Sequence, residues 1–208
     1  MSNGRQTTSG KERLNMKSSG NVNETLFQGE MVQLAAVNPE KDSKLFAKWA
    51  RDTEYLRMLD TSPVRQWSEK QYKKWFKEDL EKENQDEFLF LIRTLANDEA
   101  IGFIELDGVH WSHGDSFVGI GIGEREYWSK GYGTDAMNVI LRFAFDELNL
   151  YRVSLNVFEY NQRAIRSYEK VGFVVEGRER EFLRRAGRRW NMIFMGILKT
   201  EWEEKNKE

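Results

Sequence analysis

The sequence predicts an α+β fold, in which about four helices flank a mixed, mostly antiparallel sheet of about seven strands. Three observations predict it. A glycine-spaced apolar segment, residues 117–123, leads through a loop into a helical pattern. Residues 151–158 alternate apolar with polar, and a second helical pattern follows that Asn161 opens and Gly172 ends. Residues 87–123 hold three strand patterns separated by short turns.

The first part of the domain combines one strand with two helices. Residues 31–37 are predicted to form the strand, and residues 39–51 a helix with its apolar side chains on one side. The second helix covers residues 68–83, because Ser68 and a glutamine three residues later resemble a capping box. Residues 61–67 between the two helices are predicted to form a loop.

The remaining strands follow in two groups. Residues 87–94, 100–107 and 117–123 read as three successive strands, and the short connections between them predict an antiparallel meander. Three more strands complete the set, near residues 151–157, 173–183 and 188–198.

The composition is that of a single domain. A chain of 208 residues with 32% charged and 39% hydrophobic residues suits one domain with a tail. Residues 1–25 contain too little apolar content to offset the entropy of ordering, so they are expected to be a disordered tail without a signal peptide. With no apolar run of about 18 residues, we expect a cytoplasmic protein that does not bind membranes.

The composition also argues against cysteine chemistry and against nucleic-acid binding. The absence of cysteine excludes disulfides, thiolate metal sites and a cysteine nucleophile, and no metal site is predicted. A net charge of −2 lacks the basic excess of a nucleic-acid-binding protein, and mildly favours a cationic acceptor.

A loop that could bind a phosphate joins strand 117–123 to the next helix. Gly131, Gly133 and Thr134 are expected in the first turn of that helix, because apolar residues recur at near-helical spacing after them. The N–H groups of this turn and the helix dipole form an anion site, and the two glycines let a diphosphate approach the backbone. The alternative is a glycine-rich turn that only lets the strand and the helix pack closely.

Neither common nucleotide-binding loop matches this segment. A Walker loop needs Lys followed by Ser or Thr directly after its last glycine, whereas Lys130 precedes Gly131 here. The dinucleotide pattern G-x-G-x-x-G is broken because Glu124 stands in place of its third glycine.

The glycine-rich loop, followed by Asn161-Gln162-Arg163-Ala164-Ile165-Arg166-Ser167-Tyr168-Glu169-Lys170-Val171-Gly172-Phe173, resembles the two core motifs of the GNAT superfamily of acetyl-CoA-dependent N-acetyltransferases. The chain is most similar to the branch with ribosomal-protein N-terminal acetyltransferases and spermidine acetyltransferases. The resemblance covers residues 26–199, which implies an acetyltransferase domain between the tail and a charged C-terminal segment, residues 200–208.

The resemblance implies that acetyl-CoA is the acetyl donor and that an amine attacks it directly in a ternary complex. The implied cofactor-binding residues are Gly121, Ile122, Gly123, Trp128, Ser129, Lys130, Gly131, Tyr132, Gly133, Thr134, Asn161, Ala164 and Tyr168. Trp128 departs from the superfamily pattern, which usually has Gln or Arg at this position. A backbone N–H within residues 121–123 is expected to polarise the thioester carbonyl, although glycines there also fit a β-bulge.

Tyr168 is the candidate general acid, because the matching tyrosine of the superfamily commonly faces the sulfur. Helical spacing alone would make it a core tyrosine, just as helix capping alone would explain Asn161. Many relatives carry a glutamate where this chain has Phe117, so this candidate for the general base is missing here. Glu105, within an otherwise apolar strand, is the leading candidate, unless alternation puts it in water. Other candidates are a water chain and Asp107, Asp115, Glu124, His110 and His113, although the histidines read as turn residues.

The acceptor stays open among protein N-termini, polyamines, aminoglycosides and small amines. Loop 61–67 lies where the family forms its acceptor pocket, and four tryptophans form either an aromatic wall for a cation or part of the core: Trp49, Trp67, Trp75 and Trp111. The basic run 178–189 is expected to be a hairpin around Ala186-Gly187 whose charges face solvent, with a patch for an acidic partner as the alternative. A homodimer or a larger homo-oligomer is also left open. Two other hypotheses are a CoA-binding sensing module with little turnover and a purely structural domain.

Overall fold

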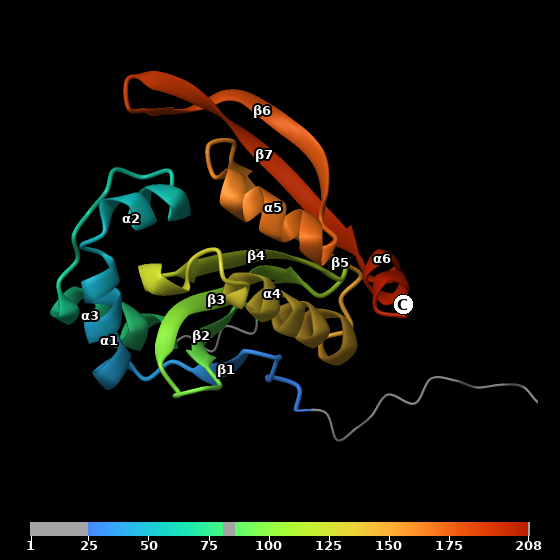
Figure 1. Ribbon diagram of the computed structural model, residues 1–208, viewed down its shortest axis with the longest axis horizontal. Coiled ribbons are helices and arrows are strands. Elements are labelled where there is room, and N and C mark those ends of the chain that lie inside the picture. Colours follow the sequence, from blue (N-terminus) through green and yellow to red (C-terminus); the bar gives the residue numbers. More distant parts are fainter. Residues whose placement is uncertain (1–24, 81–85, 208) are drawn as a thin grey trace, which may run out of the picture.

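The computed structural model describes residues 25–80 and 86–207, which form one mixed sheet with helices packed on it (Figure 1). Within these residues the sheet has seven strands in the order β1-β2-β3-β4-β5-β7-β6, and only β4 and β5 pair in parallel. The strands are β1 (Val32–Ala36), β2 (Phe88–Thr94), β3 (Ala100–His110), β4 (Asp115–Ile122), β5 (Arg152–Phe158), β6 (Val174–Arg185) and β7 (Arg188–Leu198). The predicted fold class and the antiparallel meander are confirmed.

The described chain has six α-helices rather than about four. They are α1 (Pro39–Trp49), α2 (Thr53–Leu59), α3 (Glu69–Leu80), α4 (Tyr132–Arg142), α5 (Gln162–Val171) and α6 (Lys199–Lys205). The sequence prediction missed α2, and it placed α6 within the charged C-terminal segment, which it expected to be a frayed helix. The predicted tail before Thr25 and residues 81–83 of the second predicted helix lie outside the described residues.

Local sequence explains where several helices begin and end. The capping box of α3 is formed, since the Gln71 side chain accepts from the Ser68 N–H at 3.0 Å and the Ser68 hydroxyl accepts from the Gln71 N–H at 3.4 Å. Asn161 caps α5 by accepting from the Ala164 N–H at 3.3 Å, and Gly172 ends that helix in the left-handed region at φ +119°.

Two apolar cores lie on the two faces of the sheet. The larger one packs α4 against the strands and contains Met137 and Ile140 of that helix and Ile104 of β3. The smaller one packs α1 to α3 against the other face, with Phe76 and Leu91 at its centre. Because side chains alternate along a strand, Gly119, Gly121 and Gly123 share the face that α1 and α2 cover, and Ile120 shares the face of α4.

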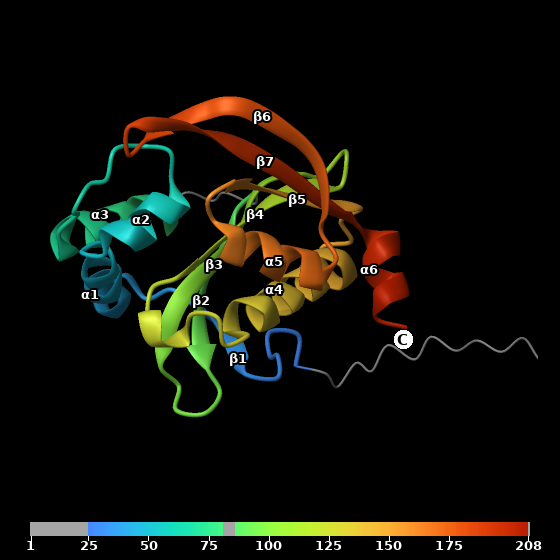
Figure 2. The ribbon, with the colours of Figure 1, turned by 45° about the horizontal axis from the view of Figure 1, so that its top comes forward.

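The β6–β7 hairpin reaches across the molecule toward α2 (Figures 1 and 2). Its turn is at Ala186-Gly187, as predicted, and both residues have positive φ, +53° and +79°. The interpretation of residues 178–189 as a solvated face is wrong for Arg185, which is half-buried against the α2 segment, while Arg184 and Arg188 are exposed.

Helix α4 also holds the segment that precedes β1. The Asp135 carboxylate accepts hydrogen bonds from the N–H groups of Glu30, Met31 and Val32 at 3.1, 2.8 and 3.0 Å. Two turns further along the helix, Arg142 donates to the carbonyl of Leu26 at 3.1 Å. The helix whose first turn was predicted to bind phosphate therefore also fastens the start of the described fold.

Among the described residues, no helix is both long enough and apolar enough to cross a lipid bilayer.

We predict that Asp135→Ala lowers the free energy of unfolding by about 3 kcal/mol, because three backbone donors lose a charged acceptor at once. Chemical denaturation measures the change. Glu147→Ala, an exposed carboxylate just beyond the same helix, is the control and should shift stability by less than about 0.5 kcal/mol. Equal effects from the two substitutions would contradict the assignment.

Candidate active site

The site begins where β4 and β5 separate. The parallel pairing covers Asp115 to Phe117 of β4 and then stops, although both strands continue. The Gly123 N–H donates to the Ile101 carbonyl of the neighbouring chain segment at 2.8 Å, so in the antiparallel ladder the N–H groups of Ile120 and Ile122 point away from β3, toward the open side. The Trp128 indole donates to the Ile122 carbonyl on that side at 2.7 Å. The strand therefore presents backbone donors to the opening.

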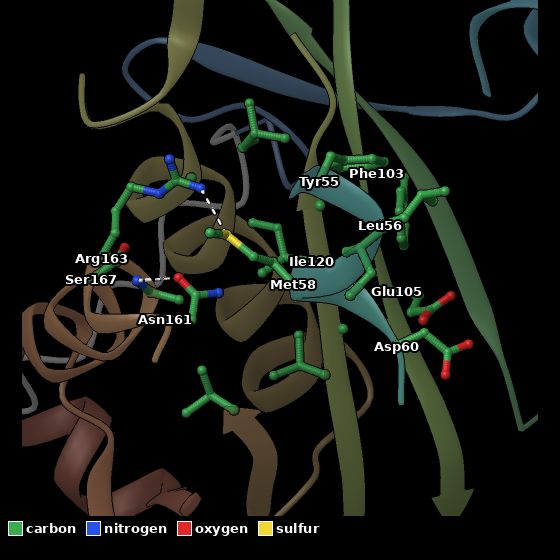
Figure 3. A pocket seen from close by; sticks show the side chains of 18 of the residues that line it. Tyr55, Leu56, Met58, Asp60, Phe103, Glu105, Ile120, Asn161, Arg163 and Ser167 are labelled. Carbon is green, nitrogen blue, oxygen red and sulfur yellow. Dashed lines mark hydrogen bonds between the residues drawn. The ribbon is translucent and has the colours of Figure 1, made fainter. Parts of the chain in front are cut away.

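One cavity of about 880 Å³ passes through this opening (Figure 3). At one end it is bordered by the start of α4 and by one side of α5 along most of that helix, and at the other by α2, the segment 60–67 and β3. In Figure 3, Asn161, Arg163 and Ser167 lie on one side of Ile120, and Glu105 and Asp60 lie on the other. The two predicted binding regions thus share one continuous space.

The α4 end of the cavity suits an anion. Helix α4 begins at Tyr132 without a side-chain cap, directly after Gly131 at φ +95°. Its first intrahelical bond runs from the Asp135 N–H to the Gly131 carbonyl at 2.9 Å, which leaves the preceding N–H groups for a ligand. The Thr134 hydroxyl lies 2.8 Å from the Ser167 hydroxyl and ties this turn to α5.

Positive side chains reinforce that end, since Arg163, Arg166 and Lys170 of α5 all line the cavity. Backbone donors, hydroxyls and cations together fit a phosphate-bearing ligand.

Most of the predicted cofactor-binding residues border this cavity: Gly121, Ile122, Trp128, Ser129, Gly131, Gly133, Thr134, Asn161, Ala164 and Tyr168. Three do not. Gly123 lies under the Trp49 ring, Lys130 is exposed, and Tyr132 packs edge-on against Tyr127 with ring centroids 4.9 Å apart.

The glycines of β4 have a packing role that the sequence analysis did not foresee. A Cβ on Gly123 would lie 2.2 Å from a ring atom of Trp49, and one on Gly121 would lie 2.8 Å from the Tyr55 hydroxyl. The register between β3 and β4 is regular from Val118 to Ile122, so Gly121 does not form the β-bulge that was the alternative. Gly123 lies just beyond the paired residues, where its N–H and that of Glu124 both donate to the Ile101 carbonyl, at 2.8 and 3.2 Å, as in a β-bulge. The absent side chains of the two glycines make room for α1 and α2, which brings these two helices close to the open strand.

Trp128 is the residue that departs from the superfamily pattern, and two arginine side chains lie over its ring. The Arg163 guanidinium lies 3.8 Å from the centroid of its ring, and that of Arg125 lies 4.9 Å away. Burial lowers the pKa of Arg163, although an arginine stays charged at neutral pH. Arg163 is a site residue that the sequence analysis did not single out, although it lies within the second core motif.

Tyr168 lies on α5 between the cavity and Phe173. Burial raises the pKa of Tyr168 to about 12, and the nearby Arg163 offsets part of that rise. The phenol therefore keeps its proton throughout the neutral range, which is the form that a proton donor needs.

Carboxylates gather at the opposite end of the cavity. Glu105 and Asp107 of β3 line it together with Asp60, which follows α2. In the register of the sheet, Asp107 is directly opposite Phe117, and Glu105 is opposite Gly119. A Cβ on Gly119 would lie 2.6 Å from the Glu105 Oε1 atom, so this glycine lets the Glu105 side chain lie across β4. This chain has no glutamate at position 117, but the neighbouring strand carries Asp107 opposite Phe117 and Glu105 two residues away from Asp107.

The other candidate bases lie outside the cavity lining. The Glu124 carboxylate accepts from Lys48 at 2.5 Å and from the Trp49 indole at 2.9 Å, which gives it a structural role. His110 and Asp115 lie 3.3 Å apart at the β3–β4 turn, where His113 is also exposed. In the described part of the chain, no group of three potential ligands could hold a metal ion.

Aromatic rings line the same end of the cavity as the carboxylates. Trp67 and Trp75 border the cavity with Tyr55, Tyr72 and Phe103, so two of the four tryptophans contribute to the wall. The others do not: Trp49 is buried under β4, and the Trp111 indole donates to Asp86 at 2.9 Å. Burial raises the pKa of Tyr55 well above its usual value, with smaller contributions from Tyr72 and Glu105.

Comparison with known proteins identifies the family. Residues 32–174 match the acetyltransferase (GNAT) domain. The chain is 31% identical over 179 residues to an uncharacterized prophage-derived N-acetyltransferase of Bacillus subtilis, YokL, covering 86% of this chain and 96% of that protein. It is 33% identical over 132 residues to the spermidine N(1)-acetyltransferase of Escherichia coli, covering 61% of this chain and 69% of that protein.

The fold is also similar to a solved structure, the spermidine N-acetyltransferase of Vibrio cholerae in complex with CoA and spermine, with a TM-score of 0.74 and 23% identity over 83% of this chain and 98% of that one. The family match covers β1 to β5, the residues that line the cavity and both core motifs, and the resemblance recognised in the sequence is confirmed: the chain belongs to the GNAT family of N-acetyltransferases.

Proposed function

We propose that the protein transfers the acetyl group of acetyl-CoA to a cationic amine by direct attack in a ternary complex. The observation that carries this proposal is the single cavity, which has cations and free helix N–H groups at one end and carboxylates and aromatic rings at the other. A phosphate-bearing donor suits the first end, and an amine suits the second. The two substrates would meet at the open edge of β4.

Each chemical need has a residue near that meeting point. Glu105 accepts a proton from the ammonium group, so that a neutral nitrogen attacks the thioester carbon. The backbone N–H groups of Ile120 and Ile122 stabilise the tetrahedral oxyanion, an effect worth on the order of 3 kcal/mol. As the carbon–sulfur bond breaks, Tyr168 donates its phenolic proton to the departing thiolate, and Asn161 contributes a polar contact to the donor's arm.

The acceptor end favours an amine with more than one positive charge. Three carboxylates, Asp60, Glu105 and Asp107, lie along a wall of aromatic rings and outnumber the single cation of that end, Arg65. Carboxylates and aromatic rings both attract cations. The Escherichia coli relative is named a spermidine acetyltransferase, which agrees with a polyamine. We therefore rank polyamines ahead of peptide N-termini, which carry a single ammonium group. A homodimer or a larger homo-oligomer stays a prediction. Light scattering, which measures the mass of the assembly, tests it.

Thiol release from acetyl-CoA, followed with a disulfide dye, tests the proposal directly, because a chain without cysteine adds no background. The panel contains polyamines, N-terminal peptides, aminoglycosides and amino acids. Release with polyamines supports the proposal, and release only with another class of amine overturns the acceptor assignment. Silence across the panel, with CoA binding confirmed, favours the sensing module, which Phe117 in place of a glutamate motivates.

We predict that Tyr168→Phe lowers kcat at least about tenfold and leaves the affinity for CoA unchanged, because only the proton donor is lost. Steady-state kinetics and calorimetry measure the two quantities. Tyr151→Phe, an exposed tyrosine away from the cavity, is the matched control and should behave like the wild type. Equal kcat values for the Tyr168→Phe variant and the wild type would exclude Tyr168 as the acid.

Glu105→Gln should lower kcat/KM for the amine on the order of 100-fold at neutral pH, because the amine loses its base. The loss should shrink as pH rises, since a larger fraction of the amine is then already neutral. The control is Asp115→Asn, which changes a carboxylate at the β3–β4 turn. A loss that is the same at every pH would indicate a binding role for Glu105 instead.

A further inference from the structure

The acceptor side of the cavity depends on a segment with little structure of its own. Helix α2 has seven residues, and the chain from Asp60 to Trp67 has no regular structure, yet both border the cavity. An isolated helix of this length is unstable in water, so tertiary contacts must hold it. Its carbonyl groups at the C-terminal end also need donors, since no intrahelical N–H reaches them.

Arg185, at the tip of the β6–β7 hairpin, supplies those donors. Its guanidinium donates to the carbonyl of Arg57 in α2, to that of Asp60 at 2.9 Å and to that of Ser62 at 3.4 Å. It also donates to the Tyr160 hydroxyl at 2.8 Å, and this hydroxyl in turn donates to the Arg57 carbonyl at 2.5 Å. One side chain, about 125 residues away in sequence, thus holds the helix end and the start of the loop together.

The hairpin presents Arg185 from a defined position. The two turn residues, Ala186 and Gly187, form a two-residue connection, and the Trp190 indole donates to the Arg185 carbonyl at 3.0 Å. The guanidinium also lies 5.5 Å from the centroid of Phe158, at the end of β5. The opposite end of α2 is held separately, because Asp52 caps the helix and pairs with Arg125.

We propose that Arg185 is a positioning residue for the acceptor, which fixes the wall formed by residues 57–67 without touching the reacting atoms. The planar guanidinium matters because it can reach several carbonyl groups at once, which a lysine ammonium on a flexible chain does less well. The kinetic part of this inference rests on the proposed function, whereas the structural part does not.

The test compares Arg185→Ala and Arg185→Lys with Arg184→Ala, which removes the neighbouring exposed arginine. Amide hydrogen exchange over residues 57–67 should rise at least about tenfold in Arg185→Ala and by nearly as much in Arg185→Lys, and should stay at the wild-type rate in Arg184→Ala. With the amine that supports thiol release, KM for that amine should rise at least about tenfold, while the affinity for CoA stays within about twofold.

A second variant keeps the test informative if Arg185→Ala does not fold. Tyr160→Phe keeps the ring but removes the hydroxyl that bridges Arg185 to Arg57, and it should change exchange and KM in the same direction by a smaller amount. Unchanged exchange in Arg185→Ala would overturn the proposal, and so would an equal rise in KM for amine and acetyl-CoA. If no amine is acetylated, the proposed function fails, but the exchange result still decides whether Arg185 holds the segment.

Discussion

The parallel pairing between β4 and β5 stops at Phe117, and the arrangement of the site depends on this early separation. Each strand keeps one antiparallel partner, β3 for β4 and β7 for β5. Both strands therefore stay hydrogen-bonded on one side after they stop pairing with each other. Beyond that point the inner backbone groups of β4 need other partners. The Trp128 indole satisfies the Ile122 carbonyl, and neighbouring N–H groups face the cavity. A gap in the sheet thereby becomes a row of fixed hydrogen-bond donors, which suits a developing oxyanion.

The two faces of β4 serve the two ends of the cavity. On one face, Ile120 and Ile122 pack near Gly133, at the start of the helix that presents N–H groups to an anion. On the other, glycines let α1, α2 and the Glu105 side chain approach the strand. The charges divide in a similar way, with Arg163, Arg166 and Lys170 at the α5 end, and three carboxylates with one arginine, Arg65, at the β3 end. Such a division orients a donor and a cationic acceptor before any contact with a reacting group.

The sequence predicts this architecture where local patterns determine it. Gly131 before α4, the Asn161 cap and the Gly172 stop are local features: Gly131 lies where α4 begins, and Asn161 and Gly172 begin and end α5. Helix α2 was missed because seven residues are too few to show a helical period, and distant groups such as Arg125 and Arg185 hold it. The function of Asp135 was missed for the same reason, since its partners lie more than 100 residues away. The glycines of β4 were assigned to ligand binding because a sequence does not show that Trp49 and Tyr55 pack against them.

The most direct test of the account is a crystal structure of the protein with CoA bound. The account predicts that the diphosphate lies at the first turn of α4, that the donor's arm runs between the separated ends of β4 and β5, and that its sulfur lies within hydrogen-bonding distance of the Tyr168 hydroxyl. A CoA molecule bound elsewhere, or one whose arm leaves the opening between the strands empty, would contradict it.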